Sequence, residues 1–410
     1  MDIYVARQPI FQRNQKVFGY ELLYRQGLTN SYDGVDGTQA SLAVIRNAFL
    51  FLGEKLLTHP RRAFINFTGD LLINGVAWML PSQYTVVEIM ENIDPDDRIV
   101  EACRKLKEAG YTLALDDYTV DDEMQNRLLD IADIVKVSLT RATEEEREAI
   151  VRKFGTSRKK LVAEGVETPG DFEAALAMGY SYFQGYFFSK PVIVPGRDIP
   201  GFKLNYMRTL QELNRKELDF HALEHIIKQD MSLCYTLLKY VNSAYFGCKD
   251  KISSILNAMV LLGEAEVRKW ASLVVFTFLG VDKPPELIVR SLIRGKMCEL
   301  LAGDVGLEGH ESELFLAGMF SLIDVLIGRP LDDILERINL TEEVKEALLR
   351  KKGRYGSLYD LVVSYESGDW EKSSGYISRH ALDPERVLGN YVRAVEWADE
   401  ITKAASSQSN

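Results

Sequence analysis

Leu113-Ala114-Leu115-Asp116-Asp117-Tyr118 is the stretch that decides the fold. Three apolar residues typical of a buried strand run directly into two adjacent carboxylates. A carboxylate pair at the end of a buried strand is costly unless a cation or hydrogen bonds offset the lost hydration, and a divalent metal is the simplest such partner. Taken alone, an Asp-Asp pair more often starts a turn or caps a helix, so the neighbouring segments must decide.

Further short apolar runs end in a residue able to bind metal or phosphate, at 17–21, 63–66, 84–88, 133–136, 160–164 and 182–184. Segments of helical composition lie between them, at 98–109, 124–131, 144–154 and 169–178. Strand and helix thus alternate from about Val17 to Pro191, which favours a parallel sheet. The number of units and the polar strand ends favour a closed TIM-like (β/α)8 barrel with its site at that rim. The glycine-rich turn of an open doubly wound sheet is missing after the first strand.

Length and composition narrow the class of protein, because 410 residues suffice for more than one domain. The net charge of −11 disfavours nonspecific binding to nucleic acid or to an anionic membrane, but leaves a small anionic ligand open. The start lacks a basic region followed by a long apolar core, and the most apolar later stretch, 271–281, is too short to span a bilayer. We therefore expect a cytoplasmic protein with neither nucleic acid nor membrane as a partner. The four cysteines have no CxxC spacing and are expected to be buried thiols.

A series of motifs runs through the first half of the chain. In order they are Arg7-Gln8-Pro9-Ile10-Phe11, Tyr20-Glu21-Leu22-Leu23-Tyr24-Arg25, Asn66-Phe67-Thr68, Glu88-Ile89-Met90-Glu91, Asp116-Asp117-Tyr118, Lys136, Ala163-Glu164-Gly165-Val166-Glu167-Thr168 and Gln184-Gly185-Tyr186-Phe187. This ordered set resembles the EAL family of cyclic di-GMP phosphodiesterases over residues 1–192. The last two motifs form the most specific pair.

The resemblance implies two divalent cations, Mg²⁺ or Mn²⁺, with Ca²⁺ as an inhibitor. The implied ligands are Glu21, Asn66, Glu88 and Asp116 for the first cation, and Asp116, Asp117 and Glu164 for the second. The two cations would share the attacking water and the leaving oxygen while cyclic di-GMP is opened to linear pGpG. Lys136 would orient water or neutralise the phosphate. Glu164 would be the general base, with an outright metal ligand as its competing role.

The resemblance also implies residues that bind the nucleotide or support the ligands. Gln8 and Arg25 would hold the nucleotide from the first strand, since the planar fork of arginine suits a phosphodiester. Glu91, Glu167 and Gln184 would lie around the ligands. Each has a plainer alternative: Arg25 as a surface ion pair, Glu91 as a solvated acid at a helix start, and Gln184 as a hydrogen-bonding residue at a strand end.

Three features depart from the family pattern. The name motif Glu-Ala-Leu reads Glu21-Leu22-Leu23, a change beside the metal ligand rather than of it. Ser138 stands where the family has an aspartate after the lysine. The loop at 118–123 is acidic and lacks the glycine of the family's Asp-Asp-Phe-Gly segment, so the same backbone would be costly. We therefore expect weak turnover, with nucleotide binding better retained.

The second half of the chain has only helical patterns. Residues 193–202 contain two prolines and two glycines and are typical of a linker. The motifs at 227–233, 237–247 and 252–263, including Asn242-Ser243-Ala244-Tyr245-Phe246-Gly247, resemble the HDOD module, a helical relative of the HD phosphohydrolases. The His-Asp pair of those enzymes is missing here, where Asp324 lies on an apolar helix, and His221 with His225 fit one face of a surface helix.

These patterns predict a barrel domain at 1–192, a linker at 193–202, an HDOD domain at 203–404 and a disordered tail at 405–410. Two classes of function remain open. One is a metal-dependent phosphodiesterase regulated by a non-catalytic HDOD domain, and the other is an inactive sensor of cyclic di-GMP or a protein-interaction scaffold. The expected partners are cyclic di-GMP and a protein bound by the HDOD domain, and a homodimer is left open.

Overall fold

The structure is a computed structural model that describes residues 3–26, 61–91, 93–119, 123–155, 157–187, 201–215, 217–229, 231–241, 252, 254–280, 283–338 and 340–406. The chain divides into two compact units. Unit 1 comprises residues 1–190 and 363–393, and unit 2 comprises residues 191–362 and 394–410. Most of the predicted linker and the HDOD motif at 242–247 lie outside the described residues.

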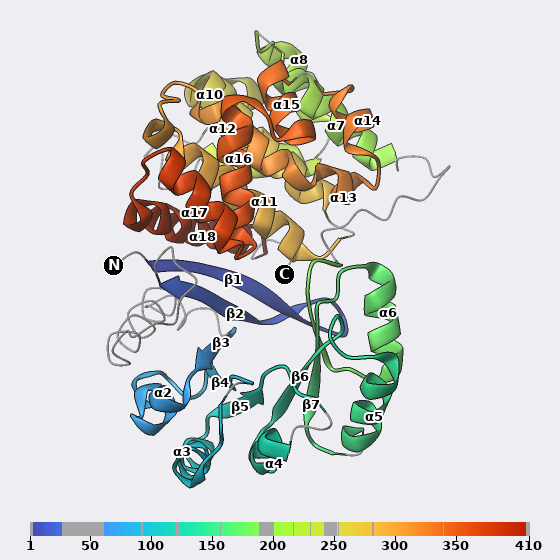
Figure 1. Ribbon diagram of the computed structural model, residues 1–410. Helices are drawn as coiled ribbons and strands as arrows, with labels where there is room; N and C mark the ends of the chain where they lie inside the picture. The colour runs from blue at the N-terminus through green and yellow to red at the C-terminus, as the bar shows by residue number, and fades with distance from the viewer. Residues whose placement is uncertain are drawn as a thin grey trace. The chain divides into compact units, whose positions relative to one another are not determined.

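Unit 1 contains a closed eight-stranded barrel, as the sequence predicted (Figure 1). Its strands in order are β1 (Ile3–Gln12), β2 (Val17–Gln26), β3 (Arg62–Phe67), β4 (Thr85–Ile89), β5 (Thr112–Leu115), β6 (Ile134–Ser138), β7 (Lys160–Glu164) and β8 (Tyr182–Gln184). Neighbouring strands from β2 to β8 are parallel. β1 differs from the expected parallel arrangement, because it is antiparallel to both β2 and β8. The turn at 13–16 is too short for the crossover that a parallel pair requires.

Helices lie outside the barrel between successive strands. They are α2 (Gly69–Ile73), the 3-10 helix η1 (Val76–Met79), α3 (Asp97–Glu108), α4 (Glu123–Leu129), α5 (Glu144–Phe154) and α6 (Pro169–Met178). Their starts follow from local sequence: the Asp96 side chain caps α3, and Thr143 and Thr168 form capping boxes at α5 and α6. The four predicted helices of this region are confirmed: α5 and α6 have the predicted bounds, and the ends of α3 and α4 differ by a residue or two.

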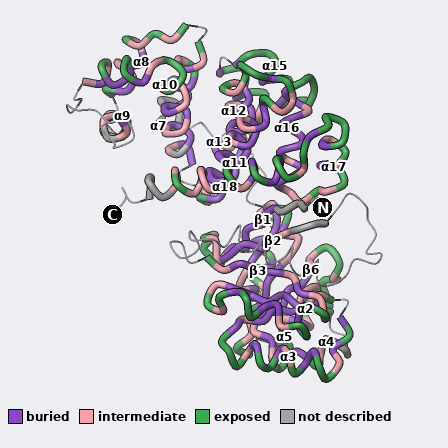
Figure 2. The backbone as a smooth tube through the Cα atoms, turned by 90° about the vertical axis from the view of Figure 1, so that its left-hand side faces the viewer, coloured by how far each residue is buried: buried purple, intermediate pink, exposed green. Residues whose placement is uncertain are grey.

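A layer of apolar side chains fills the barrel and places the polar residues above it. Its buried members are Ile10, Phe64, Val86, Ala114, Ile134 and Val162, with Phe18 and Tyr182 packed against them. Side chains along a strand alternate between its two faces, so the residue two positions further on also points inward. From β3 to β8 that residue is polar, giving Asn66, Glu88, Asp116, Lys136, Glu164 and Gln184 in turn. On the first two strands, Gln8 and Glu21 face each other in register. Figure 2 shows the buried residues along the strands and the exposed ones on the outer helices.

Helices are the regular elements described in the second half of the chain, as predicted. They are α7 (Gly201–Leu213), α8 (Phe220–Lys228), α9 (Met231–Val241), α10 (Ile255–Leu279), α11 (Pro285–Leu301), η3 (Gly303–Val305), α12 (Glu311–Met319), η4 (Phe320–Leu322), α13 (Ile323–Ile327), α14 (Leu331–Leu335), α15 (Glu342–Arg350), α16 (Gly353–Glu366), α17 (Trp370–Arg379) and α18 (Pro384–Ser406). Gly263, with φ 76°, interrupts α10 with a non-helical conformation. Residues 363–393 belong to unit 1.

Several smaller predictions can be compared with the structure. Cys103 and Cys298 are buried free thiols and Cys234 is partly buried, whereas Cys248 lies outside the described residues. Helix α18 extends to Ser406, into the predicted tail, and 407–410 lie outside the described residues. None of the helices that the structure describes is long and apolar enough to cross a membrane.

Candidate functional site

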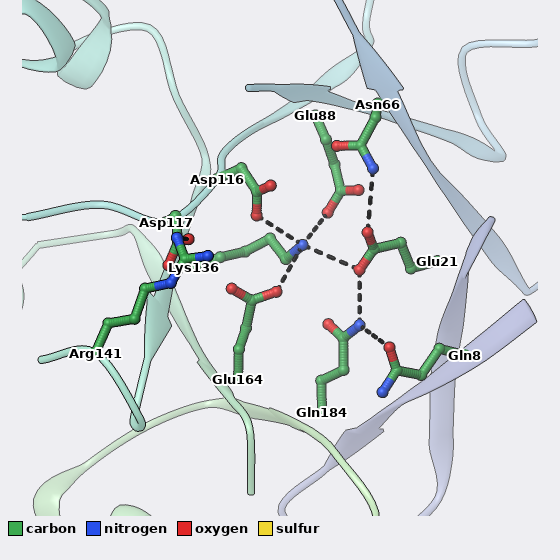
Figure 3. Close-up of polar contacts among 10 residues, drawn as sticks. All are labelled: Gln8, Glu21, Asn66, Glu88, Asp116, Asp117, Lys136, Arg141, Glu164 and Gln184. Atoms are coloured by element: carbon green, nitrogen blue, oxygen red, sulfur yellow. Dashed lines mark hydrogen bonds and ion pairs between the residues drawn. The ribbon is translucent and has the colours of Figure 1, made fainter. Parts of the chain in front are cut away.

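The ammonium group of Lys136 lies at the centre of the polar rim, with four carboxylates around it (Figure 3). Its Nζ atom is 3.1 Å from Glu21 Oε2, 2.8 Å from Glu88 Oε1, 2.9 Å from Asp116 Oδ1 and 2.8 Å from Glu164 Oε1. The Lys136 side chain is 1% exposed, so water screens these ion pairs little. Residues on or next to five different strands therefore bring one lysine and four acids to a single point.

Glu21 is held in place by amide groups from both sides (Figure 3). Asn66 Nδ2 donates to Glu21 Oε1 at 3.1 Å. Gln184 Nε2 donates to Glu21 Oε2 at 2.6 Å and to Gln8 Oε1 at 3.0 Å. The two glutamines, which lie on the neighbouring strands β1 and β8, thus fix the orientation of the first predicted metal ligand.

The carboxylates of the rim differ in their affinity for protons. Burial raises the pKa of Glu88 well above its usual value, and the charge of Glu21 adds to the effect. Burial also raises the pKa of Asp116, and that of Glu164 to about 7. In Glu21, burial acts in the same sense, but Lys136 and the amide hydrogen bonds outweigh it and lower the pKa. Lys136 therefore does not offset the cost of ionising all four acids at once.

The oxygen atoms of the rim fit a divalent cation. Asn66 Oδ1 and both carboxylate oxygens of Glu88 are buried without a hydrogen bond, although Glu88 Oε1 is an ion-pair partner of Lys136. Buried oxygens without a donor are rare, and carboxylate and amide oxygens are the ligands that Mg²⁺ and Mn²⁺ prefer. In this structure the carboxylates surround the Lys136 ammonium group. Among the described residues, no three Asp, Glu, His or Cys side chains are grouped as ligands of one metal ion.

Asp117 has a different cation as its partner. Its φ of 47° is left-handed, a conformation that aspartate adopts more readily than most residues other than glycine. Its Oδ2 atom forms an ion pair with Arg141 Nη1 in the loop between β6 and α5, and the Arg141 side chain is 71% exposed (Figure 3). No motif in the sequence singled out Arg141. The two adjacent aspartates therefore belong to two different ion-pair clusters.

Tyr118 anchors the altered loop to the outer helices. Its side chain is buried and meets the Phe154 ring edge-on, with the ring centroids 5.7 Å apart. Its hydroxyl accepts a hydrogen bond from Lys153 Nζ at 2.7 Å and donates to Asn126 Oδ1 at 3.2 Å. Of the rest of this loop, residues 120–122 lie outside the described residues.

The other predicted site residues are placed as follows. Arg25 lies on β2 opposite Tyr4, and its side chain lies outside what the structure describes. Glu91 is exposed, and its charge contributes to the raised pKa of Asp116. Glu167 is exposed, and its backbone amide donates to Asp171 Oδ2 at the start of α6. Their roles stay predictions. In unit 2, His221 and His225 are exposed on α8.

Two domain families match most of the chain. The EAL domain matches residues 37–191, and the HDOD domain matches residues 199–346. The EAL match thus begins after Glu21-Leu22-Leu23, the stretch that departs from the name motif of the family.

Two relatives are similar along nearly the whole chain. The uncharacterized protein YuxH of Bacillus subtilis is 36% identical over 98% of this chain and 100% of its own length. The cyclic di-GMP phosphodiesterase CdgJ of Vibrio cholerae is 35% identical over 98% of this chain and 93% of its own length. Among solved structures, an EAL domain protein from Listeria monocytogenes is 21% identical over 46% of this chain and 88% of its own, with a TM-score of 0.39.

Proposed function

Because the chain belongs to the family of proteins that join an EAL domain to an HDOD domain, we propose that its barrel is a metal-dependent phosphodiesterase that opens cyclic di-GMP slowly to linear pGpG. The observation that carries this proposal is the convergence of Glu21, Glu88, Asp116 and Glu164 within 3.1 Å of Lys136 Nζ. CdgJ, which is similar over nearly its whole length, bears the name of this activity.

The residues of the rim supply ligands for two cations, Mg²⁺ or Mn²⁺. Glu21, Asn66, Glu88 and Asp116 would hold the first, and Asp116, Asp117 and Glu164 would hold the second. When bound, such cations polarise a phosphodiester and lower the pKa of water. The buried oxygens of Asn66 and Glu88 that accept no hydrogen bond support the first set.

Glu164 and Lys136 have the properties that the reaction requires of the protein. The pKa of Glu164, raised to about 7 by burial, allows its carboxylate to take a proton from the attacking water near neutral pH. The buried ammonium of Lys136 supplies positive charge where a phosphate of the nucleotide would lie. Gln8 and Arg25 would hold the nucleotide from β1 and β2.

Slow turnover follows from the position of Asp117. Its Oδ2 atom is paired with Arg141, and this oxygen can bind a cation only when the pair opens. Misplacing one group of an active site by about an ångström can cost on the order of a hundredfold in rate. The HDOD domain would be non-catalytic and would act through regulation or by binding a protein.

The second candidate function is a sensor that binds cyclic di-GMP without cleaving it, and the Asp117–Arg141 pair is the observation that favours it. Chromatography of cyclic di-GMP incubated with the full chain separates the two functions. Linear pGpG formed with Mn²⁺ or Mg²⁺, and not with Ca²⁺, is the result expected of the enzyme. Binding in Ca²⁺ without product in any cation identifies the sensor, and neither binding nor product indicates a scaffold.

A further inference from the structure

The ribbon of β1 and β2 continues beyond the barrel wall. β2 pairs with β3 only over residues 19–21, and β1 pairs with β8 only over residues 10–12. The two strands nevertheless stay paired with each other as far as Ile3 and Gln26. The extension of the ribbon begins next to Gln8 and Glu21, so anything that packs on it acts close to the candidate site.

Residues 363–393, which belong to the same unit as the barrel, contact the strands that carry the two glutamines. The Tyr391 hydroxyl accepts a hydrogen bond from the backbone amide of Arg7 at 3.2 Å. The Tyr186 hydroxyl, in the segment that follows β8, donates to the backbone carbonyl of Ser367 at 3.2 Å. One contact therefore lies next to Gln8 and the other lies two residues after Gln184.

A third contact lies on β2. Gly368 has φ 72° and approaches Leu23 so closely that a Cβ atom there would be 3.0 Å from Leu23 Cδ1. The segment is itself rigidly packed around Tyr391, which is fully buried, with its ring centroid 5.2 Å from that of Tyr365. An alanine at position 368 would be strained by both the backbone conformation and the contact.

These contacts lie next to the residues whose hydrogen bonds hold Glu21. Gln184 Nε2 bridges Gln8 Oε1 and Glu21 Oε2, so the orientation of the carboxylate depends on the spacing of β1 and β8. The amide of Arg7 lies beyond the residues through which β8 pairs with β1, and the Tyr391 hydroxyl accepts its hydrogen bond instead. Loss of that acceptor removes one hydrogen bond of the Arg7 amide and loosens this part of β1, which stays paired with β2.

We propose that residues 363–393 act as a positioning element for the candidate site, with Tyr391 as the positioning residue that fixes Gln8, Gln184 and through them Glu21. The segment lies beyond residue 346, where the match to the HDOD domain ends. Within unit 1, it connects residues late in the chain to a predicted metal ligand. The effect on catalysis rests on the proposed function, whereas the structural connection from Tyr391 to Glu21 does not depend on it.

The test compares Tyr391→Phe with Tyr180→Phe in the full chain. Tyr180 is a suitable control because it too is buried in unit 1, and its hydroxyl has no hydrogen bond among the described residues. Hydrogen exchange should become faster at 6–10 and 182–187 in Tyr391→Phe only. The dissociation constant for Mn²⁺, measured by calorimetry, should rise up to about fivefold, the equivalent of about 1 kcal/mol. A fall in kcat with little change in KM for cyclic di-GMP should accompany it.

Unchanged exchange at 182–187 in Tyr391→Phe, or equal changes in the two variants, would overturn the proposal whether or not the protein hydrolyses cyclic di-GMP. Failure of the wild-type chain to form pGpG would instead count against the proposed function alone. Gly368→Ala provides a second route if Tyr391→Phe does not fold. It should produce the same faster exchange at 182–187, and unchanged exchange there in a folded Gly368→Ala chain contradicts the proposal.

Discussion

The barrel rim of unit 1 and helix α11 of unit 2 both bury charged side chains, but they arrange them differently. In the rim, four strands direct acidic residues toward Lys136 on a fifth strand. In unit 2, Glu286, Arg290 and Arg294 are buried at four-residue spacing along α11, and Asp324 is partly buried on α13. A helix spreads such residues along its length, whereas converging strand ends concentrate charge. The difference explains why chemistry is expected in the barrel.

The largest effect expected from this comparison concerns two partly buried aspartates. Asp116→Asn removes a carboxylate that both predicted cations share and should reduce hydrolysis of cyclic di-GMP by on the order of a thousandfold. Asp324→Asn changes the same group in unit 2 and should leave the rate near that of the wild type. Both proteins should remain folded, because burial already disfavours the charged form of each acid.

Equal loss of activity in the two variants, or turnover by Asp116→Asn at the wild-type rate, would contradict the expected difference between the rim and unit 2. The measurement is the initial rate of pGpG formation in Mn²⁺. Circular dichroism spectra of both variants serve as the control for folding.

A second test compares a buried lysine with an exposed one. Lys136→Met leaves four carboxylates without their common cation and should lower the free energy of unfolding by about 3 kcal/mol. Lys228→Met in α8 removes an exposed ion pair with Glu224, where the distance is 2.7 Å, and should cost less than about 1 kcal/mol. Urea denaturation in EDTA measures both values. Similar losses would show that convergence at Lys136 adds nothing to stability.

The rim was largely predictable from sequence because each polar residue from β3 to β8 lies two positions after a residue of the barrel core. Strand alternation therefore directs these side chains to one place. The direction of β1 was not predicted, since a short hairpin turn interrupts the alternation of strands and helices. The sequence also placed Lys136 at a strand end without showing that it forms ion pairs with four acids at once.

Two other features had no signal in the sequence. Arg141 lies in an exposed loop, and no spacing rule links it to Asp117. The contact between Tyr391 and Arg7 joins residues from opposite ends of the chain, and neither belongs to a pattern that predicts pairing. Such contacts depend on tertiary packing, which periodicity within one element does not reveal.

The acids of the rim should also make the stability of the folded chain depend on pH. Burial raises the pKa of Glu88 and Asp116, and that of Glu164 from 4.5 to about 7. A protonated acid whose pKa is raised by folding stabilises the folded chain. For Glu164 this contribution is fully present below the unfolded pKa of 4.5 and is lost as the pH rises through about 7. Without metal, stability should fall by on the order of 2 kcal/mol between about pH 5 and pH 8.

Denaturation curves in EDTA across this range test the expectation, and Glu164→Gln is the matched variant. The slope with pH should be smaller in Glu164→Gln, because the amide does not titrate. The lowered pKa of Glu21 has the opposite sign, and its contribution is lost only as pH falls below 4.5, outside this window. An equal slope in the two proteins would assign the pH dependence to groups elsewhere.

The smallest expected effect concerns the loop after Asp117. Tyr118→Phe combined with Thr119→Gly restores the family's Phe-Gly pair and should raise the hydrolysis rate up to about tenfold, with little change in affinity for the nucleotide. It should also cost about 1 kcal/mol of stability, because the hydrogen bonds of the Tyr118 hydroxyl to Lys153 and Asn126 are lost. Tyr118→Phe alone should show the cost without the gain. An unchanged rate in the double variant would place the slow step elsewhere.

The most direct test of a metal site in the barrel rim is the binding of Mn²⁺ to the full chain, measured by electron paramagnetic resonance. We expect the wild type and Asp324→Asn to bind Mn²⁺ equally, and Asp116→Asn to lose this binding. Absence of Mn²⁺ binding in the wild type, or equal binding in all three proteins, would contradict the claim that the converging strand ends of the barrel form a metal site.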